Sequence, residues 1–310
     1  MATNNSSVYK INDRVILVQV LVSLFLCINF LLMTTFLMRD FFYTTMRYIL
    51  FAITLLSDSV FLLMTDILLI LSYFHFTIQM WLCLIMYIVL SLYTFVTPVT
   101  LTAMTLERYV AICMPLRHGE LCSTRSALHG ILIIHGLSSV PCIVVLSIFF
   151  ASATHSFYTK SGICSVEMFI LHTWQGHIRS AISEFYFLIM CITIVFSYVK
   201  IMKVARAASG ESKKSTWKGL RTVLLHGFQL LLCLIQLWCP FIEAAVLQTN
   251  FMLFINVRYF NYVTFILAPR CLSPLIYGLR DEIFFHALKY YALCGLYKKY
   301  QSSFHDKFKS

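Results

Sequence analysis

The stretch Met80–Ile112, MWLCLIMYIVLSLYTFVTPVTLTAMTLERYVAI, decides the fold because it is long, continuous and almost entirely apolar. About 20 apolar residues are enough to cross the hydrocarbon core of a bilayer. The apolar residues do not alternate with polar ones at a period of two, as they would in a barrel strand. This stretch therefore predicts a membrane-spanning helix that continues beyond the lipid.

Six further apolar runs of similar length predict an all-α integral membrane protein with a bundle of seven transmembrane helices. The seven predicted spans are Val15–Met38, Met46–Tyr73, Met80–Ile112, Ser126–Ala151, Ile178–Lys203, Lys218–Leu247 and Asn256–Leu279. Residues 281–291 then combine charges with apolar residues every three or four positions, which predicts a short amphipathic helix on the membrane surface. The expected organisation is an N-terminal segment over 1–14, the membrane domain over 15–279 and a helix with a tail over 280–310.

The composition agrees with a lipid environment and excludes several other classes. Hydrophobic residues make up 60% of the 310 residues and charged residues only 12%, against about 25% charged in soluble domains. The net charge of +11 comes from basic residues in short gaps between apolar runs, so it does not indicate a nucleic-acid partner. Eleven cysteines in this length do not make a small disulfide scaffold.

The distribution of lysine and arginine predicts the orientation of the bundle. With seven spans, 18 of the 24 basic residues fall on the side opposite the N-terminus and five on the N-terminal side. Because cytoplasmic loops carry the excess of basic residues, we expect the N-terminus outside the cell and the chain in the plasma membrane. Residues 1–14 lack an apolar run, so the first helix is expected to act as the insertion signal. Asn4 and Asn5 are overlapping glycosylation acceptors on that outer side.

The third span ends in the string Leu106–Arg117, LERYVAICMPLR. It resembles the inner end of the third helix in rhodopsin-like (class A) G-protein-coupled receptors, and most closely that of odorant receptors, with Glu107 in place of their Asp. Similar matches follow in SYVKI at 197–201, in Lys218, Thr222 and His226, and in SPLIYGLR at 273–280. LWCP at 237–240 is instead similar to non-odorant members, and this mixture indicates a divergent branch similar to the fish-type odorant receptors.

The resemblance implies a receptor, not an enzyme, that binds a small organic odorant and activates a heterotrimeric G protein of the stimulatory, olfactory type. It implies that Arg108 faces a cytoplasmic cleft, with Glu107 as its resting partner, and that Pro240 kinks the sixth helix beside Trp238. The residues expected to serve coupling and activation are Glu107, Arg108, Tyr109, Tyr198, Thr222, Trp238, Pro240, Pro274 and Tyr277.

The expected ligand is a small organic molecule held between the helices. No acid occurs from Met80 to Leu106, where amine receptors of this family anchor an ammonium group. Asn256–Leu279 contains no lysine, so the chain lacks the residue that binds retinal in opsins. Carried over by register, the ligand-contacting residues are expected to be Leu90, Ser91, Thr94, Ser183, Tyr186, Phe241, Ile242, Ala245, Tyr259 and Val263. Three more carboxylates, Asp66, Glu184 and Glu243, either contact a basic ligand or pair with Arg179 or Arg258.

The resemblance also implies a disulfide between Cys83 and Cys164 and a buried polar network in the middle of the bundle. The members of this network are Asn29, Asp58, Thr97, Arg270 and Ser273. Many rhodopsin-like receptors hold a sodium ion on the carboxylate equivalent to Asp58, but Arg270 lies about one turn before Pro274 and would make that ion redundant. An arginine at mid-depth needs a partner, so we expect an Asp58–Arg270 pair; the alternative is that Arg270 faces a cavity or the ligand.

Other functions remain as alternatives. A transporter would be expected to show internal repeats, and a membrane enzyme a cluster of histidines or cysteines, whereas the ten histidines are scattered without metal-ligand spacing. We therefore expect no metal and no cofactor. Within the receptor class the alternative is a non-olfactory receptor for a peptide or a lipid.

Overall fold

The computed structural model describes residues 3–121, 124–154, 160–208, 227–272 and 282–292, and within them it is almost entirely helical. Seven of these helices are long and apolar enough to cross a membrane, which confirms the predicted all-α seven-helix bundle. The elements are α1 (Thr3–Leu37), α2 (Asp40–Tyr43), α3 (Met46–Tyr73), β1 (Ile78–Gln79), α4 (Met80–Cys113), α5 (Pro115–Leu121), α6 (Thr124–Ser152), β2 (Ser161–Gly162), η1 (Val166–Phe169), α8 (Thr173–Ala208), η2 (Gln236–Trp238), α10 (Cys239–Leu247), α11 (Phe251–Asn261), η3 (Tyr262–Leu267) and α13 (Glu282–Ala292).

The predicted spans overlap these helices, and the largest difference is at the N-terminus. α8 also extends five residues beyond the predicted fifth span at each end, and α11 begins five residues before the predicted seventh span. α3 has the predicted bounds and α4 ends one residue later than expected. α1, however, begins at Thr3, within the segment expected to precede the first helix, although its membrane-length part begins at Asp13. The first 14 residues contain neither proline nor glycine, so nothing in them ends the helix. The start of the sixth predicted span and the end of the seventh lie outside the described residues.

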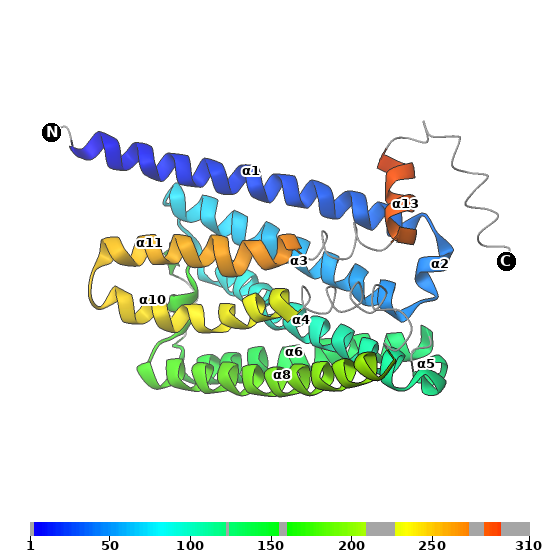
Figure 1. The fold of residues 1–310 in the computed structure, drawn as a ribbon. Coiled ribbons are helices and arrows are strands. Elements are labelled where there is room, and N and C mark those ends of the chain that lie inside the picture. Colours follow the sequence, from blue (N-terminus) through cyan, green and yellow to red (C-terminus); the bar gives the residue numbers. More distant parts are fainter. Residues whose placement is uncertain (1–2, 122–123, 155–159, 209–226, 273–281, 293–310) are drawn as a thin grey trace.

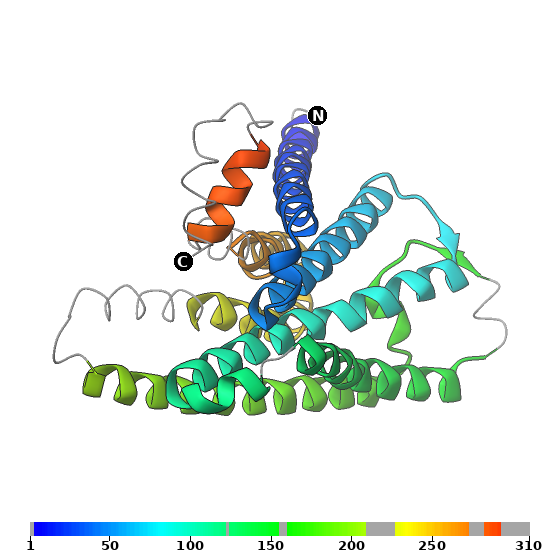
Figure 2. The same cartoon turned by 90° about the vertical axis from the view of Figure 1, so that its right-hand side faces the viewer.

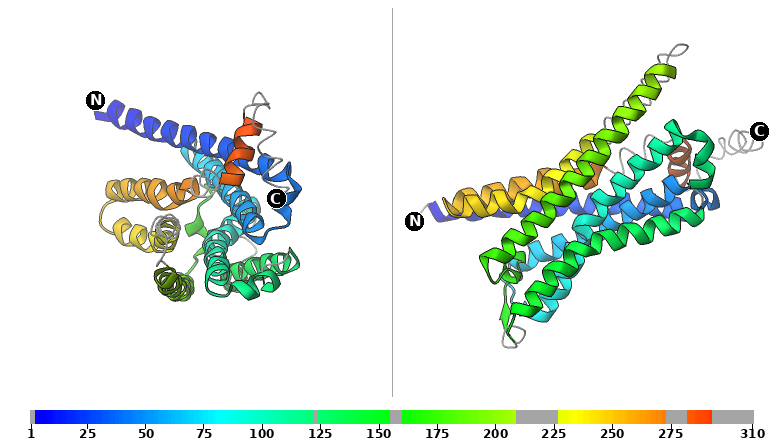
Figure 3. Two further views of the ribbon diagram at one scale, coloured as in Figure 1. Left: turned by 45° about the vertical axis from the view of Figure 1, so that its right-hand side comes forward. Right: turned by 90° about the horizontal axis from the view of Figure 1, so that it is seen from below.

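α3 and α4 form the middle of the bundle, and the other helices pack around them (Figure 1). α1 lies along α3, α6 and α8 lie against α4, and α10 runs beside α11. Seen from below, the C-terminal turns of α8 project beyond the other helices (Figure 3). Aliphatic and aromatic side chains of α3, α4 and α8, such as Leu55, Leu101 and Ile194, fill the main buried cluster.

A proline inside a helix leaves one backbone carbonyl without its usual amide donor, and at two prolines another donor replaces it. Pro141 removes the amide that would bind the Leu137 carbonyl of α6, and the Tyr186 hydroxyl of α8 donates to that carbonyl at 2.6 Å. Pro240 does the same to the Gln236 carbonyl, which accepts from the Cys239 amide in the tighter turn η2. Before Pro269, residues 262–267 form the π-helical turn η3. The sixth membrane helix, Gly227–Leu247, which contains η2 and α10, and the seventh, Phe251–Leu272, which contains α11 and η3, are therefore irregular next to their prolines.

The two ends of the bundle carry different structures. At one, the disulfide end, β1 and β2 pair in an antiparallel register with Ile78 opposite Gly162 (Figure 2). At the other, the α13 end, α13 crosses the end of α1 next to α2. Phe284 of α13 is 1% exposed and packs against Phe42 and Phe51. The helix predicted over 281–291 is thus confirmed, and its apolar side is held by aromatic residues of α2 and α3.

Candidate functional site: a buried charge pair within a receptor bundle

Asp58 of α3 and Arg270 of the seventh helix face each other in the middle of the bundle. The distance from Arg270 Nε to Asp58 Oδ1 is 3.6 Å, and neither side chain is exposed. The Thr97 hydroxyl of α4 donates to the same carboxylate oxygen at 2.9 Å. The structure therefore brings together three of the five residues predicted to form the polar network, from three different helices.

The other side of the guanidinium is bound by groups that the sequence analysis did not select. Arg270 Nη1 donates to Gln236 Oε1 of η2 at 2.9 Å and to the Ile266 carbonyl at 3.1 Å. The Phe61 ring of α3 lies 3.7 Å from the guanidinium carbon, in cation–π contact. A guanidinium has five N–H donors, so the sequence indicates that Arg270 needs further acceptors, but it does not distinguish Gln236 from Gln229 of the same helix.

Asn29, the fourth residue of the predicted network, contacts α3 at the residue after Asp58. It is buried on α1, and its side-chain amide donates to the Ser59 hydroxyl of α3 at 3.1 Å. The last residue of the predicted network, Ser273, lies outside the described residues.

Four of the residues predicted for coupling and activation, Glu107, Arg108, Tyr109 and Tyr198, lie toward the C-terminal ends of α4 and α8, at the α13 end. Glu107 is buried and Arg108 half-buried near the end of α4, and the Tyr109 ring packs against Phe196 of α8 at 5.9 Å. The Tyr198 ring lies so close to Gly227 that a Cβ atom there would be 3.0 Å from Tyr198 Cε2. Glycine at 227 thus lets α8 and the sixth helix approach closely. Thr222, Pro274 and Tyr277 lie outside the described residues.

Trp238 ends the tight turn η2, and Pro240 follows it at the start of α10; we call this point, where proline interrupts the helix, the bend of the sixth helix. The Trp238 ring packs edge-on against Phe187 of α8 at 6.0 Å and remains 43% exposed. The bend itself follows from Pro240, because the Gln236 carbonyl has lost its usual donor.

The predicted ligand-contacting residues fall into three groups. The first group lies on α4 and α8, where Leu90 and Ser183 are buried and Ser91 is half-buried. The Thr94 hydroxyl donates to the Leu90 carbonyl. The Tyr186 hydroxyl donates to the Leu137 carbonyl, and its ring packs on Phe95. On α10, Phe241 is half-buried, whereas Ile242 and Ala245 are exposed. In the third group, Tyr259 and Val263 of the seventh helix pack into an apolar cluster of α1 and α3 that includes Val18 and Leu62.

The turn η3 explains the position of this third group. A π turn holds about one residue more than an α turn, and one extra residue rotates what precedes it by about 100°. Positions carried outward from Pro274 by ordinary helical spacing therefore change faces at η3. Tyr259 additionally lies under the Arg14 guanidinium of α1, at 5.2 Å.

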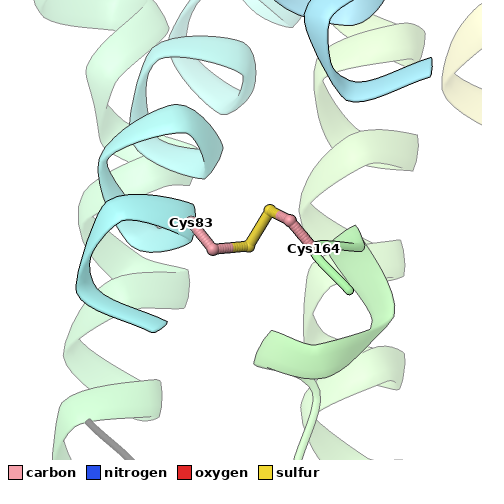
Figure 4. The surroundings of a disulfide bond; sticks show 2 residues. All are labelled: Cys83 and Cys164. Atoms are coloured by element: carbon pink, nitrogen blue, oxygen red, sulfur yellow. A yellow bond between two sulfur atoms is a disulfide. The ribbon is translucent and has the colours of Figure 1, made fainter. Parts of the chain in front are cut away.

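Cys83 and Cys164 form a disulfide at the disulfide end, with their Cα atoms 5.5 Å apart (Figure 4). The bond links the first turn of α4 to the segment that follows β2. Phe149, Phe169 and Tyr87 pack around it in a buried cluster. The predicted pairing of these two cysteines is thus present in the structure.

The three additional carboxylates have different surroundings. Glu243 lies 3.8 Å from the Arg258 guanidinium and accepts from Asn261 at 3.0 Å. Asp66 of α3 accepts from the side-chain amide of Gln19 on α1, and Glu184 is exposed. Asn4 and Asn5, the predicted glycosylation sites, belong to the first turns of α1.

The comparisons with known proteins agree with this architecture. The family described as 7 transmembrane receptor (rhodopsin family) matches residues 28–277. This protein belongs to that family, which indicates a multi-pass membrane receptor and not a typical enzyme.

Within the family, the chain is similar over nearly its whole length to an odorant receptor. It is 43% identical to Odorant receptor 131-2 of Danio rerio over 96% of this chain and 93% of the relative. Galanin receptor 2b of Danio rerio is 24% identical over 72% of this chain and 59% of its own length. The first likeness places the chain in the odorant-receptor branch.

Proposed function

We propose that this protein is an odorant receptor of the plasma membrane that binds a small organic molecule between its helices and activates a heterotrimeric G protein of the stimulatory, olfactory type. The observation that carries the proposal is the 43% identity to Odorant receptor 131-2 of Danio rerio over 96% of the chain. A disulfide needs an oxidising compartment, and the basic residues concentrate at the opposite end. Both support an extracellular disulfide end and a cytoplasmic α13 end.

The side chains around the proposed ligand site favour a ligand without a strong positive charge. The described part of α4 has no acid between Met80 and Leu106. Of the carboxylates toward the disulfide end, Glu243 already contacts Arg258 and Asn261. Ser91 and Ser183 supply hydroxyls among apolar neighbours such as Leu90, so shape and one or two hydrogen bonds would hold the odorant.

Arg108 is the residue on which coupling is proposed to depend. A guanidinium at the cytoplasmic boundary can exchange a neighbouring carboxylate for backbone carbonyls of a partner protein. Glu107 supplies that carboxylate at the adjacent position of α4. Movement of the sixth helix away from α4 and α8 would open the cleft in which the partner binds.

The test is the Arg108→Ala variant in cells that express the olfactory G protein. We expect ligand-independent and odorant-stimulated cyclic AMP to fall to the level of untransfected cells, while surface labelling stays at the wild-type level. Arg117→Ala is the matched control, because Arg117 is an exposed arginine at the same end of the bundle, and it should signal normally. Retained signalling by Arg108→Ala at normal surface density would refute the proposed coupling.

The second candidate is a non-olfactory receptor for a peptide or a lipid. The likeness to Galanin receptor 2b and the LWCP string of the sixth helix favour this alternative. Transcript mapping separates the two candidates: expression confined to olfactory sensory neurons supports an odorant receptor, and expression only in other tissues supports the alternative.

A further inference from the structure

Gln236 occupies a special place in the sixth helix. Its own carbonyl is the one that Pro240 deprives of a donor, and it opens the tight turn η2 at which the helix bends. The side chain is only 7% exposed and binds the Arg270 guanidinium through Oε1 at 2.9 Å. The bend of the sixth helix is thus attached, through one side-chain hydrogen bond, to a charged group of the seventh helix.

That charged group is itself positioned from outside the sixth helix. Asp58 attracts Arg270 Nε at 3.6 Å, and the Phe61 ring covers the guanidinium at 3.7 Å, both from α3. The Thr97 hydroxyl of α4 in turn holds the Asp58 carboxylate. α3 and α4 form the middle of the bundle, so the guanidinium is a fixed point relative to which the sixth helix can move.

From this arrangement we infer that Gln236 is a positioning residue that ties the bend of the sixth helix to the Asp58–Arg270 pair in the resting receptor. This inference rests on the proposed function, because it takes movement of the sixth helix as the signalling step. It assigns the resting constraint to a specific bond, Gln236 Oε1 to Arg270 Nη1, and not to the charge pair alone.

The chemistry of the bond suits a constraint that must open. A hydrogen bond to a charged donor is stronger than one between neutral groups, and water does not compete for it in a buried site. When Gln236 leaves, Arg270 Nη1 keeps the Ile266 carbonyl and Nε keeps Asp58. Opening therefore strands no unpaired buried charge, which would be far more costly.

The chain provides a matched control in Gln229, seven residues before Gln236 on the same helix. Gln229 is also fully buried and also binds the seventh helix, but through the Pro269 carbonyl at 3.3 Å and not through the guanidinium. At either position, leucine replaces the side-chain amide of glutamine with an apolar group of similar size. Only the change at 236 removes a bond to the charged group.

The first measurement is ligand-independent cyclic AMP in cells with matched surface densities of the full-length receptor. Loss of one charge-assisted hydrogen bond changes an equilibrium by about tenfold, so Gln236→Leu should raise basal signalling severalfold to about tenfold. Gln236→Glu keeps an acceptor and should hold basal signalling at or below the wild-type level. Gln229→Leu should leave it within about twofold of wild type. Equal basal signalling in the two leucine variants would overturn the inference.

The second measurement does not depend on signalling, and so separates a failure of this inference from a failure of the proposed function. Thermal unfolding of the purified full-length receptor in detergent is followed for a double-mutant cycle. Gln236→Leu should lower Tm in the wild type but have little further effect once Arg270→Met has removed the guanidinium. Gln229→Leu should lower Tm equally in both backgrounds.

The cycle is decisive in either direction. A Tm loss from Gln236→Leu that is the same with and without Arg270 would show that the amide acts independently of the charge, and the tether would be wrong. Where Arg270→Met does not yield folded protein, the comparison of Gln236→Glu with Gln236→Leu takes its place: the glutamate variant should melt above the leucine variant, and the reverse order would refute the tether.

Discussion

Within the described part of the seventh helix, Arg270 and Arg258 each pair with an acid of a neighbouring helix, and the two pairs differ in almost every physical respect. In the middle of the bundle, Asp58 and Arg270 are both 0% exposed. Toward the disulfide end, Arg258 is 47% exposed beside Glu243 at 17%. The first pair has lost all its water, whereas the second keeps much of it.

The comparison shows that distance alone does not determine what an ion pair contributes. The N–O distances are similar, 3.6 Å and 3.8 Å. An exposed pair contributes at most about 1 kcal/mol, because water screens the attraction. In the buried pair each charge depends on the other, because removal of one leaves the other with neither water nor an opposite charge beside it. The buried pair is also held by hydrogen bonds from outside the pair, since Thr97 donates to Asp58 and Gln236 accepts from Arg270.

The largest expected effect comes from breaking the buried pair. Asp58→Arg or Arg270→Asp alone should destabilise the receptor by about 3–5 kcal/mol, because each leaves two like charges buried together. Surface expression, measured by antibody labelling of intact cells, should fall strongly in both. The double reversal Asp58→Arg with Arg270→Asp should recover part of it; a double variant no better than the singles would contradict the pairing.

A smaller loss is expected when the covalent link at the disulfide end is removed. Cys164→Ser should cost about 2–5 kcal/mol, since the bond constrains a loop between residues 81 positions apart. The measurement is Tm of the purified receptor, together with non-reducing peptide mapping that should identify the Cys83–Cys164 peptide in the wild type. A fall in Tm in Cys164→Ser but not in Glu243→Gln would show that stability at the disulfide end depends on the disulfide and not on the Glu243–Arg258 pair. Two free thiols in the wild type would contradict the structure.

The smallest effect is expected at the exposed pair. Glu243→Gln should change the free energy of unfolding by less than about 1 kcal/mol, because Arg258 keeps its contact with water and lies over the Phe254 ring at 5.5 Å. Surface expression and Tm should stay close to wild type. A loss comparable with that of Arg270→Asp would mean that the two pairs are not distinguished by burial.

The fold and the charged centre could be predicted from the sequence because the bilayer leaves few alternatives. A continuous apolar run in lipid must be a helix, so Met46–Tyr73 was predicted with both its ends. Asp58 and Arg270 were matched by the register of the family resemblance and by depth, since two intramembrane charges at one level have few other partners. The disulfide pairing was implied by the family resemblance. It was also specific, since Cys164 is the one cysteine between the fourth and fifth predicted spans.

The remainder of the site depends on deviations from helical geometry, which the sequence does not display. Gln236 reaches Arg270 from a bent turn, and a regular helix drawn from the sequence does not indicate which amide will do so. Tyr259 and Val263 pack with α1 and α3 because η3 changes their face. The hydroxyl of Tyr186 is bound to the Leu137 carbonyl that Pro141 frees on α6, a partner that depends on which helices are neighbours. The ligand-contacting role of these residues stays a prediction.

We expect α13 to lie on the membrane surface, and its anchoring by Phe284 would then set the depth of the whole bundle in its bilayer. An amphipathic helix lies at the boundary between headgroups and hydrocarbon, and Phe284 holds this one against Phe51, near the first residues of α3. The 28 residues of α3 span about 42 Å at 1.5 Å per residue, whereas the hydrocarbon is about 30 Å thick. With one end held at the interface, the excess must emerge on the far side or be taken up by tilt. To the extent that it emerges, the strand pair stands in water above the membrane, and a dissolved molecule meets that part of the receptor before it meets lipid.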